Sequence, residues 1–198
     1  MTRIRSYALL GATALFSASV AVPAALAGGM KAENRAGTQQ QAAVQQQALT
    51  AQNFVLYATN ADLFQAEASK IAVQRAQSSE VKAYAQQMAS QHANATSKLN
   101  MVARQAGVTP VTPVLTVHMQ QKLAELQHTS TTAFDERYIT LLQEAQEREL
   151  RLHNAYARGG DNATLRAAST DTAQLVSQHL AEARRISTSI LADRPAGS

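Results

Sequence analysis

Two carboxyl groups and two imidazoles fall where a core-facing helix would normally carry an apolar side chain: Glu67, His92, Glu149 and His179. His92 is the clearest case, because the other members of its stripe are all apolar: Val81, Ala85, Met88, Ala95, Leu99, Val102 and Ala106. A buried polar group costs free energy unless it has a partner. Two imidazoles with one or two carboxylates form a ligand set that suits a single Zn, Mn or Fe ion.

Helical rise predicts that these residues lie at similar heights in a bundle. Glu67 and His92 lie roughly 16 and 21 Å along their helices from a turn predicted at residue 78. Gln146 and His179 lie roughly 20 and 29 Å from the turn at the opposite end. In a bundle about 40 Å long, all of them fall in or near the middle third, so the side chains can meet.

The spacing around the histidines excludes the signature of a carboxylate-bridged di-iron centre. Such centres need Glu-x-x-His on two helices, but Ala89 and Val176 stand three residues before the two histidines. Two interpretations remain open. The first is a mononuclear metal site, with Glu149 as a fourth ligand beside Glu67, His92 and His179. The second, which we favour, is a pair of core histidines bonded to Glu67 or Glu149 that fix the helix register.

The other polar motifs give little support for catalysis. His118, His128 and His153 fall on short or exposed segments, and we expect them to be solvated. No Ser-His-acid order and no glycine-rich phosphate loop can be assigned, and "ARGGDN" is a turn between helices. We therefore predict a protein that is not an enzyme and has no cofactor, except a divalent ion if the metal interpretation holds.

Apolar residues with helical spacing predict four long helices, over residues 50–77, 80–107, 133–158 and 161–192, and a short one over 115–127. The predicted core-facing stripe of the first helix is Phe54, Tyr57, Ala61, Phe64, Ala68 and Ile71. Ser78 and Ser79 before Glu80 indicate an N-terminal cap, Gly107 a left-handed C-terminal residue, and Asp161 a cap for the last helix.

The predicted fold class is all-α, a ferritin-like four-helix bundle with a short extra helix between the second and third long helices. The connecting residues 108–132 are long enough to cross back along the bundle. We therefore expect the second and third long helices to run parallel. A plain up-down-up-down bundle would not need so long a connection.

The first 27 residues have the pattern of a secretory signal peptide. Arg3 and Arg5 precede a mostly apolar run, and Ala25-Leu26-Ala27 forms a small-residue cleavage site. A retained membrane anchor is the less favoured alternative, because the run contains Ser, Thr and Gly and ends in Pro23. We expect a periplasmic protein whose mature chain has no membrane span. A Gln/Ala-rich linker (28–49), the bundle domain (50–192) and a short tail (193–198) complete the predicted organisation.

Charge and composition limit the partners. The chain has 18 basic and 14 acidic residues, and loss of the two signal-peptide arginines lowers its net charge from +4 to +2. Scattered charges without interleaved aromatic residues do not predict nucleic-acid binding. With no Cys, the protein has no disulfide and must be held together by packing. The two Gln triplets of the linker leave a partner-binding arm open as an alternative, and the oligomeric state stays open too.

Three blocks of sequence resemble an exported bacterial family known as domain of unknown function 4142, which has a ferritin-like fold and is often labelled an outer membrane protein. They are "NFVLYATNADLFQAEASKIAVQRAQSSEVKAYAQQMASQHANATSKLNMVARQAGV", "FDERYITLLQEAQEREL" and "LVSQHLAEA". The resemblance covers about residues 51 to 190. It implies a periplasmic helical bundle whose biochemical role is unassigned.

The family pattern also bears on the candidate site. It implies a Glu at Glu67 and histidines at His92 and His179, but also a histidine where this chain has Gln146 and a Pro near Gln174. An amide is a poorer ligand than imidazole, which weakens the metal interpretation. We therefore expect a non-catalytic role in interaction or envelope stress, with a mononuclear metal-binding or metal-dependent redox protein as the alternative.

Overall fold

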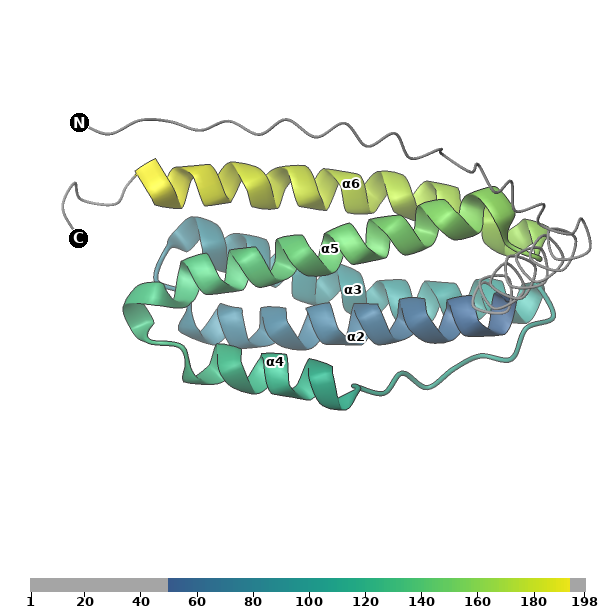
Figure 1. Ribbon diagram of the computed structural model, residues 1–198, viewed down its shortest axis with the longest axis horizontal. Coiled ribbons are helices and arrows are strands. Elements are labelled where there is room, and N and C mark those ends of the chain that lie inside the picture. The colour runs from purple at the N-terminus through teal and green to yellow at the C-terminus, as the bar shows by residue number, and fades with distance from the viewer. Residues whose placement is uncertain (1–49, 193–198) are drawn as a thin grey trace, which may run out of the picture. The chain divides into compact units, whose positions relative to one another are not determined.

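The computed structural model describes residues 50–192, which form helices and their connections without a strand (Figure 1). The predicted signal peptide, linker and tail lie outside these residues. Within the described range, no helix is long and apolar enough to cross a membrane. The elements are α2 (Ala51–Arg75), α3 (Ser79–Gln105), α4 (Val117–His128), the 3-10 turn η1 (Thr131–Ala133), α5 (Phe134–Gly159) and α6 (Ala163–Ala192). The prediction of an all-α helical bundle is confirmed.

Helices α3 and α5 run in the same direction, because the segment containing α4 returns the chain along the bundle before α5 begins (Figure 1). Side-chain contacts agree with this course. Asn162, in the α5–α6 turn, donates to the carbonyl of Ala106 after α3 at 3.1 Å. Arg185, near the end of α6, pairs with Glu80 at the start of α3 at 2.7 Å. The predicted parallel arrangement of the second and third long helices is therefore observed.

Local capping sets the helix ends. Ser78 Oγ accepts a hydrogen bond from the Val81 N–H, and Gly107 has φ of +71°, both as predicted. The predicted cap of α6 is wrong by one residue, since Asn162 Oδ1 accepts from the Leu165 N–H at 3.1 Å. A capping side chain bonds the N–H three residues later. Asp161 instead accepts a hydrogen bond from the Tyr156 hydroxyl at 2.9 Å.

Arg75, at the end of α2, fixes α4 to the outside of the bundle. Its guanidinium donates to three carbonyls at the end of α4, those of Leu126, Gln127 and Thr129, at 2.5 to 2.9 Å. It also lies 4.6 Å above the Phe134 ring. The last carbonyls of a helix are poorly satisfied by their own chain, and here the Thr129 N–H reaches only the Leu126 carbonyl, at 3.3 Å. A single cation therefore satisfies the end of α4 and favours its dipole.

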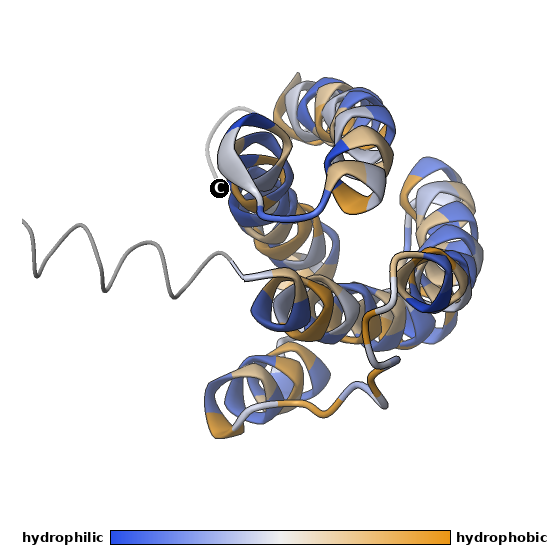
Figure 2. Cartoon of the chain, turned by 90° about the vertical axis from the view of Figure 1, so that its right-hand side faces the viewer, coloured by the Kyte–Doolittle hydropathy of each residue, from blue (hydrophilic) through white to orange (hydrophobic). Residues whose placement is uncertain are grey.

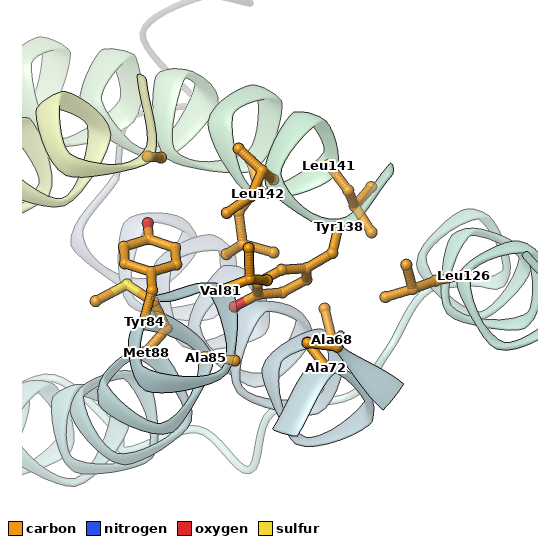
Figure 3. Packing of buried hydrophobic residues seen from close by; sticks show 14 of the residues in the cluster. Ala68, Ala72, Val81, Tyr84, Ala85, Met88, Leu126, Tyr138, Leu141 and Leu142 are labelled. Carbon is orange, nitrogen blue, oxygen red and sulfur yellow. The ribbon is translucent and has the colours of Figure 1, made fainter. Parts of the chain in front are cut away.

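Buried apolar residues form two clusters with a polar layer between them. The first cluster includes Phe64, Met88, Tyr138 and Ile186, and Figure 3 shows Tyr138 of α5 lying near Val81 of α3 and Ala68 of α2. The second includes Phe54, Ala103, Tyr156 and Leu165. A layer of buried polar residues separates most of the two clusters, with Gln65 just beyond Phe64 of the first cluster: Asp62, Gln65, His92, Gln146, Glu149, His153 and His179.

Helix α2 is rotated relative to the sequence prediction. Tyr57 is 48% exposed, whereas Asp62 is 4% and Gln65 0% exposed. The cause is α4, which gives α2 a second partner. Tyr57, Ala61 and Phe64 of the predicted stripe line a groove with Met119 of α4. Phe54 and Ala68 are buried in the two apolar clusters as predicted, and the polar stripe of α2 is buried beside them. Figure 2 colours each helix by hydropathy and shows both apolar and polar faces. Hydropathy alone does not determine which neighbouring helix packs against each face.

Two adjacent glycines after α5 provide a matched test of packing. A Cβ at Gly160 would lie 2.5 Å from the Tyr156 ring, which is fully buried and stacked on Phe54 at 4.1 Å. We expect Gly160→Ala to lower the free energy of unfolding by about 1–3 kcal/mol. Gly159→Ala, with nothing within 4 Å of the new Cβ, should cause no loss. Urea unfolding of both variants measures the difference, and equal stabilities would contradict this packing.

Candidate metal centre

Four helices place ionisable side chains at one height in the bundle. Counted from the end where α2 finishes and α3 starts, Asp62, His92 and His179 are each 13 residues along their helices, and Glu149 is 15. This is about 20 Å of helical rise. His153 follows Glu149 by one turn on α5. All five side chains belong to residues that are at most 5% exposed.

The centre of this group is formed by Asp62, His92 and Glu149. One possible ligand atom from each of them lies within 4.8 Å of the other two. A hydrogen bond of 2.8 Å joins His92 Nδ1 to Asp62 Oδ1. When Asp62 is ionised, only the Nδ1–H can donate, so the lone pair of His92 stays on Nε2, which has no hydrogen-bond partner among the described residues.

Glu149 is held on one side only. Gln65 Nε2 donates to its Oε2 at 2.5 Å, and the other oxygen lies 3.8 Å from His153 Nε2, too far for a good hydrogen bond. Glu149 Oε1 therefore has capacity for a further partner.

His179 extends the cluster from the α6 side. Its ring centre lies 5.8 Å from that of His92, and two imidazoles that share one ion have ring centres about 5–6 Å apart. Neither nitrogen of His179, nor Nδ1 of His153, has a hydrogen-bond partner among the described residues. Because buried polar atoms are usually paired, these free nitrogens fit a site that receives a cation.

Burial makes the charged forms of all five groups unfavourable. It raises the pKa of Asp62 well above its usual range. It raises the pKa of Glu149 to about 7, an effect that His92 opposes and Asp62 increases. Burial lowers the pKa of His92, and it lowers the pKa values of His153 and His179 to about 4, with a smaller contribution from His92. At neutral pH the imidazoles are therefore uncharged and available as ligands, and a bound cation would favour ionised carboxylates.

Three of the four residues predicted from the sequence lie in this cluster: His92, Glu149 and His179. Glu67 does not, because its side chain is 36% exposed and pairs with Lys70 at 2.7 Å. Asp62 takes its place. The two residues are five positions apart, which is about 140° around a helix, so the rotation of α2 exchanges one for the other. The signal for Asp62 was a polar stripe at helical spacing: Thr59, Asp62, Gln65 and Ser69.

His153 and Gln146 also bear on the predictions. The expectation that His153 is solvated is wrong, since it is 3% exposed and lies against Phe54, with ring centres 5.3 Å apart. The same expectation is confirmed for His118 and His128. Gln146 is buried and donates to the Tyr84 hydroxyl at 2.7 Å, so its amide holds a neighbouring tyrosine.

The fold and the cluster define an all-α helical bundle with carboxylates and imidazoles gathered in its core. Residues 36–186 match the family described as domain of unknown function (DUF4142). The chain belongs to this family. Neither the comparison with curated proteins nor that with solved structures gives a significant match.

The raised pKa of Glu149 predicts a pH-dependent stability for the metal-free protein. Because this pKa rises from 4.5 unfolded to about 7 folded, the stabilising contribution of the protonated side chain is present below pH 4.5 and is lost as pH rises through 7. Glu149→Gln should therefore exceed the parent in stability by up to about 3 kcal/mol at pH 8, and by less at pH 5. Urea unfolding in chelator at both pH values tests this, with Glu67→Gln as the surface control. A difference that does not change with pH would contradict it.

Proposed function

We propose that this protein binds one divalent metal ion, of the group Zn, Mn and Fe, in the core of an exported ferritin-like bundle. The observation that carries the proposal is the convergence within 4.8 Å of ligand atoms from Asp62, His92 and Glu149, which belong to three different helices. Bonds of about 2.1 Å to one ion bring ligand atoms to at most about 4.2 Å apart. Small side-chain rotations therefore close the site.

The cost of burial favours metal binding over a purely structural role. A buried carboxylate or imidazolium loses hydration worth several kcal/mol, and well-packed apolar residues are often as stable as a buried ion pair. The two carboxyl groups and three imidazoles of the polar layer therefore weaken the bundle unless they share a ligand. A role in interaction or envelope stress alone gives no reason for their convergence.

The finer classification belongs to the proposal as well. The parallel course of α3 and α5, with the long connection between them, supports a ferritin-like bundle. The signal-peptide pattern of residues 1–27 supports export to the periplasm.

Metal binding is expected to raise the melting temperature of the chain, with a stoichiometry of one ion per chain. At a free metal concentration of about 100 times Kd, the ion adds about 2.7 kcal/mol to the free energy of unfolding. His92→Ala should remove this shift, whereas Glu67→Ala should keep it. Thermal unfolding with Zn, Mn and Fe, together with elemental analysis, gives the answer. Absence of metal and of any shift in the parent would reject the proposal, as would an equal shift in His92→Ala.

A double substitution separates the metal ligands from structural residues. Asp62→Leu with His92→Leu replaces a buried hydrogen-bonded pair by apolar side chains, so the metal-free protein should be as stable as the parent or more stable. The same variant should gain nothing from added metal. Urea unfolding with and without the ion measures both effects, and retention of the metal-induced gain would show that this pair is not part of the site.

A further inference from the structure

A cleft between α3 and α6 reaches the candidate metal centre. It has a volume of about 400 Å³. Its walls come from α3 and α6, and include Lys98 on one side and Ala168 and Asp171 on the other. Asp62 and His153, which belong to α2 and α5, form its inner end. The cleft therefore connects the polar layer with the surface.

The inner end of the cleft has a hydrogen-bonding group without a partner. His153 is 3% exposed, and its Nδ1 makes no hydrogen bond within the described residues. An imidazole ring carries an N–H in either protonation state, so a nitrogen of this ring can donate to a ligand in the cleft. On the α3 wall, Lys98 makes no ion pair with any described residue, so its charge is available to a ligand.

Metal coordination supplies a third interaction. Three protein ligands, or four if His179 takes part, leave at least one position open on a five- or six-coordinate ion. We propose that this cleft binds a small anion, which enters between α3 and α6, is attracted by Lys98, accepts a hydrogen bond from His153 and coordinates the metal ion directly. This inference rests on the metal binding proposed above.

The test uses the full chain loaded with Co(II), whose visible absorption reports its ligands, and azide as the anion. Stoichiometric Co(II) binding is measured first, because its failure rejects the metal site itself. Azide should then change the Co(II) spectrum with a saturable affinity. If Co(II) binds but azide does not change its spectrum, the anion site is overturned and the metal site stands.

Neighbouring alanines on α6 provide a matched pair of variants. Ala168 lines the cleft, whereas Ala167 is exposed and does not. Ala168→Phe should fill the cleft and abolish the azide response while Co(II) still binds. Ala167→Phe should leave both unchanged. An unaltered azide response in Ala168→Phe would show that anions reach the ion by another route and would overturn the proposal.

The two charged wall residues test the attraction in opposite directions. Lys98→Met should weaken azide binding roughly two- to fivefold, and Asp171→Asn should strengthen it by a similar factor, as expected for solvent-exposed charges. Added salt should reduce both effects. Azide affinity that neither substitution changes would contradict the part assigned to Lys98.

Discussion

Desolvation of the polar layer is the constraint on which the rest of this structure depends. Asp62, His92 and Glu149 lose their hydration in the middle of the bundle, and burial displaces their pKa values toward the uncharged forms. Hydrogen bonds from His92 to Asp62 and from Gln65 to Glu149 offset part of this cost. The apolar clusters on either side must supply the remaining stability, since the described residues contain no cysteine.

The connectivity of the bundle gives this layer its geometry. Because α3 and α5 are parallel, His92 and Glu149 reach the same height at nearly the same distance from the starts of their helices. Helices α2 and α6 run in the opposite direction. Asp62 and His179 therefore reach the same height at a similar distance from the ends of their helices. An up-down-up-down order would reverse α5 relative to α3. The long connection through α4, fixed by Arg75, is therefore as important for the site as the ligand residues are.

The site also explains why sequence spacing located some residues and missed others. His92 was recognisable because it interrupts an apolar stripe on a helix whose buried face lies on that stripe. Asp62 lies on the polar side of α2, where a carboxylate is usually solvated, and only the packing of α4 against the apolar side turns it inward. His153 was overlooked although it lies four residues after Glu149, on the same face of α5, so helical spacing alone already indicated its burial.

The sequence by itself determined the number, type and approximate bounds of the helices in residues 50–192, since helical periodicity, Ser78 and Gly107 act over a few residues. It also determined the direction of the crossing connection, because segment length limits the chain path. The tertiary structure alone decided which face of α2 is buried, and hence that Asp62 rather than Glu67 joins His92. The physical reason is that a helix with partners on two sides buries more than its apolar stripe, and only the packing of all helices together decides which polar side chains are enclosed with it.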